Sequence, residues 1–177
     1  CLSSIPNMHI MAPKNKWELS DMLKYAVEFD GPIALRYPRG EAYDGLKEYR
    51  RPIEYGKSEV IYEEEDIALL AVIFVGHMFG EALEVRKQLK EAGYHCSLVN
   101  ARFVKPIDTE VLDMLSADHK LLVTMEENVR SGGYGEKVMD YVVEQELPVK
   151  LLNISLPDEY VEHGNVALLY EEVGIDA

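Results

Sequence analysis

Apolar and polar positions at the front of the chain predict a strand, a helix and a second strand. Residues 8–12 form a short apolar run that Pro13 closes. Asn15, followed three residues later by Glu18, is a helix capping box. The apolar residues that come next recur at helical spacing: Leu19, Met22, Leu23, Ala26 and Val27.

The second strand of this front unit spans residues 32–35, after the stop signal Asp30-Gly31. It ends in Arg36-Tyr37-Pro38-Arg39-Gly40. A strand–helix–strand unit of this size leaves unpaired sheet edges on both sides, so residues 1–40 are too few to form a domain of their own. Residues 41–56 are polar, show no sustained period and are interpreted as a linker.

The remainder of the chain, residues 57–177, alternates strands with helices. Two β-rich runs, 58–62 and 67–74, flank an acidic turn, and such a short connection predicts an antiparallel pair. The helices predicted after them span about 77–91, 108–116, 133–145 and 166–172. The strands between them are 96–100, 120–124 and 149–154. The fold class is therefore α/β: a mostly parallel sheet with helices on both faces and an antiparallel strand pair at its start.

Charge disfavours several classes of partner. The chain carries 18 Lys and Arg against 32 Asp and Glu, a net charge of -14. Residues 1–56 hold equal numbers of basic and acidic side chains, so the whole excess falls in residues 57–177. This acidity disfavours nonspecific binding to nucleic acid or to an anionic membrane. Small anionic substrates stay compatible with it, because nearby basic groups can oppose the global sign.

Cysteine count and hydropathy predict a cytoplasmic location. Cys1 and Cys96 are too few for a disulfide framework, so a reducing compartment is the default. No apolar run reaches the roughly 18–20 residues of a membrane span, and no signal peptide is visible. Because the chain starts at Cys1 instead of Met, we expect it to be a portion of a longer protein.

The turn at residues 36–40 is the strongest candidate for chemistry. It lies at the carboxyl end of a strand, where ligands collect in open α/β sheets. Arg36 and Arg39, stiffened by Pro38, form a cationic turn that suits a phosphate or a carboxylate. The alternative is a solvated turn whose arginines pair with nearby carboxylates.

A glycine-rich segment, residues 131–135, comes at the start of the helix predicted over 133–145. Backbone amides at a helix start can hold phosphate, but this segment lacks the Lys-Ser/Thr of a P-loop and the GxGxxG spacing. Close helix-to-strand packing or a subunit contact is favoured instead. Glu126 and Glu127 lie just past the preceding strand, and adjacent carboxylates normally point apart, which disfavours a catalytic pair. One of them could cap the glycine-rich turn or meet a partner chain.

Histidine and serine spacing indicates no familiar active site. The five histidines show neither HxxxH nor HExxH spacing, which disfavours a metal site: His9, His77, His95, His119 and His163. His77 lies where a strand meets its helix and could reach the ligand-binding edge, whereas His163 lies in a loop; neither receives a role. No serine lies in a GxSxG elbow. We identify no catalytic, cofactor-binding or metal-binding residue.

Short runs along the whole chain occur in one continuous register. They are Ile5-Pro6-Asn7-Met8, Ile10-Met11-Ala12-Pro13, Gly31-Pro32, Arg36-Tyr37-Pro38-Arg39-Gly40, residues 99–106, 123–128 and 132–135, Leu156-Pro157-Asp158, His163-Gly164 and Gly174-Ile175-Asp176. As an ordered set they resemble the 1-deoxy-D-xylulose-5-phosphate synthase family of transketolase-like enzymes. The start departs from the family, which usually has Tyr-Leu-Arg in place of Cys1-Leu2-Ser3.

The resemblance implies a homodimer that decarboxylates pyruvate and joins the two-carbon unit to D-glyceraldehyde 3-phosphate. The product serves isoprenoid, thiamin and pyridoxal synthesis, and the full-length parent uses thiamin diphosphate and magnesium. By the same resemblance, residues 1–40 end a pyrimidine-binding domain and residues 57–177 form a C-terminal domain. Arg39 corresponds to the arginine that contacts the phosphate of the aldehyde, with Arg36 as a supporting candidate.

The family's Gly-Asp-Gly…Asn stretch, which holds magnesium and diphosphate, matches no position in this chain. The histidines around the thiazolium and the glutamate that activates the aminopyrimidine are also unmatched. We therefore expect the chain alone to bind no cofactor and to be inactive. Two alternatives stay open: a non-catalytic transketolase-type C-terminal docking subunit, and the β subunit of a 2-oxoacid dehydrogenase decarboxylase component. The turn at 36–40 and the run at 100–106 favour the synthase.

Overall fold

A five-stranded sheet forms the larger part of the molecule. The computed structural model describes residues 5–36, 45, 47–63, 70–127 and 133–156. The strands of the larger sheet lie in the order β3 (Glu59–Tyr62), β5 (Cys96–Asn100), β4 (Leu70–Phe74), β7 (Leu121–Glu127) and β8 (Lys150–Leu156). Every neighbouring pair is parallel except β3 with β5. The predicted fold class, a mostly parallel α/β sheet, is confirmed.

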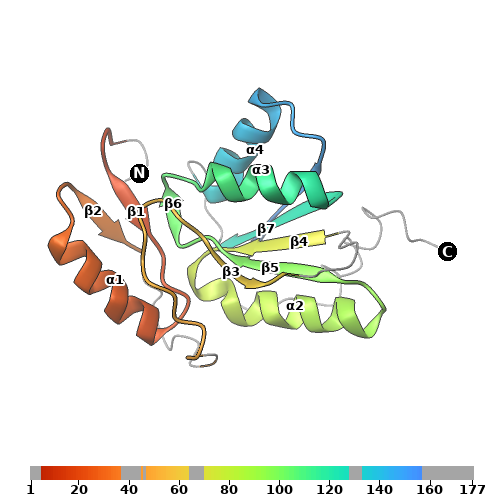
Figure 1. Cartoon of the computed structure of the whole chain (residues 1–177), viewed down its shortest axis with the longest axis horizontal. Helices are drawn as coiled ribbons and strands as arrows, with labels where there is room; N and C mark the ends of the chain where they lie inside the picture. The colour runs from red at the N-terminus through yellow and green to blue at the C-terminus, as the bar shows by residue number, and fades with distance from the viewer. Residues whose placement is uncertain (1–4, 37–44, 46, 64–69, 128–132, 157–177) are drawn as a thin grey trace.

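Helices cover both faces of this sheet (Figure 1). The short 3-10 helix η2 (Gly76–Met78) leads into α2 (Phe79–Glu91) on one face. Helices α3 (Thr109–Asp118) and α4 (Tyr134–Glu144) lie on the other face. The helix predicted over 166–172 lies outside the described residues.

The central strand β4 shows why the core has two halves. Its side chains alternate between the two faces of the sheet. Leu70, Val72 and Phe74 join the apolar cluster under α2, whereas Ala71 and Ile73 join the cluster under α3 and α4. A strand that is buried on both faces reads as a continuous apolar run, which is the pattern that predicted it.

The partner of β3 differs from the prediction. We expected β3 and β4 to form an antiparallel hairpin, but β5 lies between them and β3 pairs antiparallel with β5. Strand β4 already has a parallel neighbour on each side, β5 and β7. Burial alternates along β3, which suits the edge position it occupies. The short connection between β3 and β4 therefore does not make these strands adjacent in the sheet.

A second, three-stranded sheet lies at one end of the molecule (Figure 1). Its order is β2 (Ile33–Leu35), β1 (His9–Met11) and β6 (Phe103–Lys105). Strands β1 and β2 are parallel, and β6 pairs antiparallel with the other edge of β1. A strand from the second half of the chain thus covers an edge of β1 that residues 1–40 alone would leave unpaired.

Helix α1 (Lys16–Glu28) begins as predicted, with one difference. The Asn15 Oδ1 accepts a hydrogen bond from the Glu18 N–H at 2.9 Å, which confirms the cap. The Glu18 carboxylate, however, accepts from the Lys14 N–H at 3.1 Å instead of closing the capping box. Met22 is buried against β1 and β6, whereas Val27 is 87% exposed, so the apolar stripe of this helix is only partly buried.

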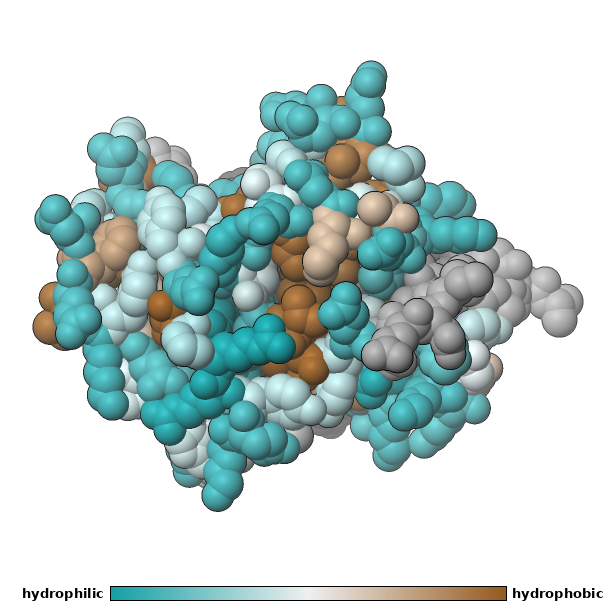
Figure 2. All heavy atoms as spheres, viewed as in Figure 1, coloured by the Kyte–Doolittle hydropathy of each residue, from teal (hydrophilic) through white to brown (hydrophobic). Residues whose placement is uncertain are grey.

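The face of the molecule that Figure 2 draws is largely polar. Figure 2 shows hydrophilic residues over most of the viewed face, with apolar residues in separate areas. Among the residues that the structure describes, the large apolar side chains that are exposed are Ile5, Leu23, Val27, Tyr55, Met114, Met139 and Val143. No helix within the described ranges is long and apolar enough to span a membrane.

A buried cluster of charges joins the front unit to the larger sheet. Its members, each at most 2% exposed, are Lys14, Glu18, Glu59, Asn100 and Arg102. The Lys14 Nζ donates to Glu18 at 2.8 Å and to Glu59 at 2.6 Å. The Arg102 guanidinium donates to the same two carboxylates at 3.2 and 3.0 Å. Two cations thus meet two anions in a balanced set.

The cluster also organises the segment interpreted as a linker. The remaining Arg102 donors bind the backbone carbonyls of Arg51 and Pro52 at 2.7 and 2.8 Å. In return, the Arg51 N–H donates to the Glu59 carboxylate at 3.1 Å. The Asn100 side-chain amide donates to both Glu18 oxygens, at 2.9 and 3.0 Å. Residues 51–52 are therefore anchored by the side chains of Glu59 in β3 and of Arg102, two residues after β5.

Opposite charges keep Glu59 ionised despite its burial. Burial by itself would raise the pKa of this carboxyl group. The attraction of Arg102 and Lys14, together with the hydrogen bonds from Lys14 and Arg51, outweighs burial and keeps the pKa below its ordinary value of 4.5. An ionised Glu59 therefore stabilises the folded state.

We predict that Glu59→Gln lowers the free energy of unfolding at pH 7 by about 3–5 kcal/mol, because it leaves buried cations short of a counter-charge. Since the folded pKa lies below the unfolded one, this contribution is present above pH 4.5 and is lost as the pH falls through the folded value. Urea unfolding should show the gap between the two proteins narrowing below pH 4.5.

The matched control is Glu54→Gln, an exposed carboxylate five residues earlier, which should change stability by no more than about 0.5 kcal/mol. A gap for Glu59→Gln that stays constant down to low pH would contradict the ionised role.

Candidate functional site

The front unit packs against the edge of the larger sheet where its parallel strands end. Strands β4, β5, β7 and β8 all run parallel, so their carboxyl ends share this edge. The Ala12 N–H donates to the Arg102 carbonyl at 2.8 Å, just past β5. Gly76, just past β4, has φ +57°, and a Cβ there would lie 3.1 Å from the Ala12 Cβ. Glycine is needed at this close approach.

Arg36 lies where the sequence placed it, at the carboxyl end of β2. Its N–H donates to the Met11 carbonyl at 2.8 Å, which continues the pairing of β2 with β1, and its side chain is half-buried. Arg39, the other predicted phosphate-binding residue, lies outside the described residues, as does His163. The position of Arg36 keeps it a candidate for anion binding.

The amides of the glycine-rich turn are already bound by a side chain. The Glu126 carboxylate accepts from the Tyr134 N–H at 2.8 Å and from the Gly135 N–H at 3.0 Å. A Cβ on Gly133 would lie 2.8 Å from a Glu126 oxygen, and one on Gly135 would lie 2.9 Å from the Asn153 Cγ. This supports close packing over phosphate binding and identifies Glu126 as the cap of α4.

His77 and Glu127 meet at the same edge at a longer distance. The His77 Nε2 lies 4.0 Å from a Glu127 oxygen, with side chains 21% and 48% exposed. Adjacent carboxylates on β7 thus point to different surroundings, as expected. Glu126 is engaged by backbone amides, whereas Glu127 is 48% exposed and lies near a histidine.

Two lysines near Arg36 were not singled out from the sequence. Lys105 ends β6 and Lys137 lies in the first turns of α4, both half-buried. Burial lowers the pKa of Lys137, and the charges of Arg36 and Lys105 lower it further, against the opposing effect of Glu136 and Glu126. A lysine this close to a helix N-terminus opposes the helix dipole, which is the signal that sequence analysis could have used.

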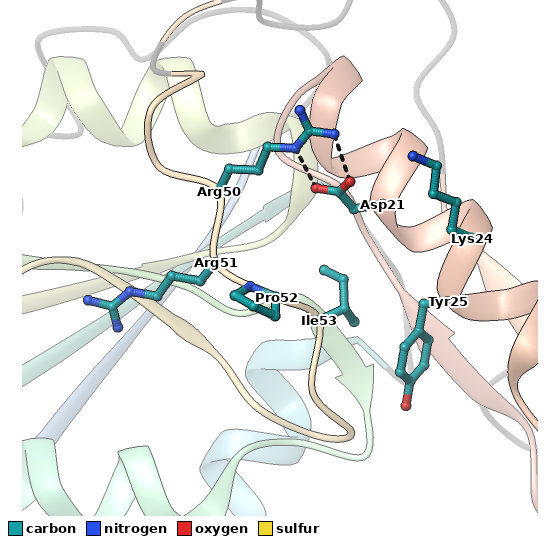
Figure 3. Close-up of a pocket in the computed structure, with 7 residues that line it drawn as sticks. All are labelled: Asp21, Lys24, Tyr25, Arg50, Arg51, Pro52 and Ile53. Atoms are coloured by element: carbon teal, nitrogen blue, oxygen red, sulfur yellow. Dashed lines mark hydrogen bonds and ion pairs between the residues drawn. The ribbon is translucent and has the colours of Figure 1, made fainter.

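A shallow pocket of about 350 Å³ lies between α1 and residues 50–53 (Figure 3). The Arg50 guanidinium donates to both Asp21 oxygens at 2.8 Å, and this bond lowers the pKa of Asp21. Lys24 and Tyr25 also line the pocket from α1. Because Arg50 and Asp21 neutralise each other and no residue predicted from sequence lines it, this pocket is a weaker candidate.

The described residues do not fit a magnesium diphosphate site. Across the described ranges, no three His, Cys, Asp or Glu side chains gather closely enough to hold a metal ion. The amides of the glycine-rich turn, which were one possible phosphate cradle, are bound by Glu126.

The transketolase C-terminal domain profile matches residues 56–177. The chain belongs to this family. It is 49% identical, over 177 residues, to a 1-deoxy-D-xylulose-5-phosphate synthase of Lachnoclostridium phytofermentans, which confirms the resemblance. The match covers 99% of this chain and 28% of that relative, so the chain spans little more than a quarter of the relative's length.

Solved structures of the transketolase family share the fold. One is described as a split gene transketolase in an inactive beta4 tetramer; its TM-score is 0.79 at 26% identity, over 98% of this chain and 55% of that chain. Another is transketolase from Campylobacter jejuni, with a TM-score of 0.61 at 15% identity, over 99% of this chain and 25% of that chain. Both cover the front unit as well as the C-terminal domain.

We predict that Glu126→Ala lowers the free energy of unfolding by about 1–2 kcal/mol, because the α4 amides lose their acceptor in a buried site. Hydrogen exchange at the Tyr134 and Gly135 amides should accelerate together with the loss of stability. Glu127→Ala, next in the chain but exposed, is the control and should change neither quantity appreciably. Equal effects of the two substitutions would remove the capping role.

Proposed function

We propose that this chain is the C-terminal part of a 1-deoxy-D-xylulose-5-phosphate synthase. The observation that carries the proposal is the 49% identity to one such enzyme over nearly the whole chain. The parent would condense pyruvate, with decarboxylation, and D-glyceraldehyde 3-phosphate. It would act as a homodimer in the cytoplasm and supply isoprenoid, thiamin and pyridoxal synthesis.

Within that parent, residues 1–40 would end the pyrimidine-binding domain and residues 57–177 would form the C-terminal domain. Residues 41–56 would be the linker between the two domains. Arg39 would bind the phosphate of the aldehyde, supported by Arg36. A guanidinium suits this task because it donates paired hydrogen bonds to phosphate oxygens. Thiamin diphosphate and magnesium would be held by other parts of the parent, because the family's cofactor motif matches no position here.

We predict that the 177-residue chain alone forms no 1-deoxy-D-xylulose 5-phosphate. The assay mixes the purified chain with thiamin diphosphate, magnesium, pyruvate and D-glyceraldehyde 3-phosphate and measures product by mass spectrometry. The control is the full-length parent under the same conditions. Product from the chain alone would refute its inactivity, and no product from the parent would refute the proposed reaction.

We predict that Arg39→Ala in the parent raises the KM for D-glyceraldehyde 3-phosphate by about tenfold or more, since one charge-assisted hydrogen bond contributes about 1.5–3 kcal/mol. The KM for pyruvate should stay within about twofold, because pyruvate has no phosphate. Steady-state kinetics with each substrate varied in turn measures both. Equal increases in the two KM values would remove the phosphate role.

A separate transketolase subunit is the second candidate. It is favoured by the likeness to a solved chain described as a split gene transketolase. The reading frame upstream of Cys1 separates the two candidates. A continuous frame that encodes a Gly-Asp-Gly…Asn stretch supports the synthase, whereas a stop codon close to Cys1 supports a separately encoded subunit.

A further inference from the structure

Residues 49–55, here called the strap, contact both the front unit and the larger sheet. Figure 3 shows residues 50–53 passing alongside α1, with the Arg50 side chain turned toward Asp21 and that of Arg51 turned away from the helix. On the side of the larger sheet, the Tyr49 ring meets the Tyr62 ring of β3 at a centroid distance of 5.6 Å. The contacts to the two sides differ in how far they are exposed to water.

The inner side of the strap is anchored in the buried charge cluster. The Arg102 guanidinium donates to the carbonyls of Arg51 and Pro52 at 2.7 and 2.8 Å. The Arg51 N–H donates to Glu59 at 3.1 Å, and Arg102 and Glu59 are at most 2% exposed. Arg102 has φ +58°, a left-handed conformation that a non-glycine residue keeps only where its surroundings fix it. Contacts that are buried and mutually dependent make this side of the strap the harder one to open.

The outer side of the strap is held to α1 by an exposed ion pair. The Arg50 Nε and Nη2 donate to the two Asp21 oxygens at 2.8 Å each. The Arg50 and Asp21 side chains are 44% and 24% exposed. Paired donors make this a well-oriented ion pair, but water and salt ions reach it and screen its attraction. It is therefore the weaker of the two fastenings.

The packing between the strap and α1 is incomplete beside this ion pair. Ile53 is half-buried and packs against the apolar cluster of Met11, Met22 and Phe103. Ile53 also lines the pocket of about 350 Å³ that lies between the strap and α1. Because this space is not filled by protein, less apolar surface opposes separation of the strap from α1 once Arg50 leaves Asp21.

We propose that the strap is a salt-sensitive latch. Its outer side opens from α1 when Arg50 leaves Asp21, while Arg102 and Glu59 hold its inner side as a hinge. Opening exposes Ile53 and widens the pocket, and the larger sheet stays folded because the buried anchor is intact. Segments with few buried apolar contacts open locally in this way, at a lower free energy than global unfolding. Ionic strength then sets how much of the strap is open.

Trypsin cleavage after Arg50 measures the opening, because cleavage of a transiently opened segment follows the population of its open form. The 177-residue chain is digested under native conditions, and mass spectrometry assigns the cut. Asp21→Asn leaves the cleavage site intact and should speed this cut about fivefold in low salt, the upper value for an exposed ion pair. Salt at about 0.5 M should speed cleavage of the unsubstituted chain toward the rate of the variant.

Two further variants separate the latch from general loosening. Asp30→Asn, an exposed carboxylate two residues after α1, is the matched control and should be cut at the unsubstituted rate. Glu59→Gln, at the hinge, should speed the cut and global unfolding in urea together. A peptide with the same bond corrects for the effect of salt on trypsin itself.

Three results would each overturn the latch. The first is equal cleavage of Asp21→Asn and Asp30→Asn, and the second is a cleavage rate of the unsubstituted chain that salt leaves unchanged after correction. The third is faster cleavage of Asp21→Asn that its global unfolding in urea fully accounts for.

Discussion

The buried set of Lys14, Glu18, Glu59 and Arg102 is the constraint on which the arrangement of this molecule depends. Removing any one of the four charges leaves another charge buried without a counter-charge, which costs far more than the ion pair itself contributes. The four side chains come from the start of α1, from β3 and from the residue after Asn100 and Ala101. The front unit therefore has one position relative to the larger sheet in which every charge is matched.

This fixed position decides which parts of the sheet edge are open to a ligand. Ala12 packs beside Gly76 and bonds to the residue after β5, so protein occupies the edge at β4 and β5. Glu126 fills the amino end of α4. Among the described residues, internal contacts thus occupy the β4 and β5 part of the edge at which α/β sheets usually bind ligands.

Local patterns in the sequence were sufficient to predict most helices and strands, but not to predict which strands pair with each other. The uniformly apolar run of β4, the helical period of α2 and the Asn15 cap each depend on neighbours in the chain, and each was predictable. The pairing of β3 with β5 and the existence of β6 depend on contacts between distant segments, which a local period cannot encode. Glu18 illustrates the difference: its spacing from Asn15 predicted a local bond, but long-range cations attract its carboxylate instead.

The candidate functional residues show the same difference between what local sequence predicts and what depends on distant segments. Arg36 was predictable because strand-end position and residue type are both local properties. Lys137 had a local signal, its place near a helix N-terminus, but its electrostatic neighbours Arg36 and Lys105 come from distant segments. The net charge of -14 did not predict this group of cations either. Two of its three members, Lys105 and Lys137, lie in residues 57–177, which carry the whole acidic excess. Exposed charges act over about 8–10 Å in physiological salt, so acidic side chains on distant faces barely affect these cations.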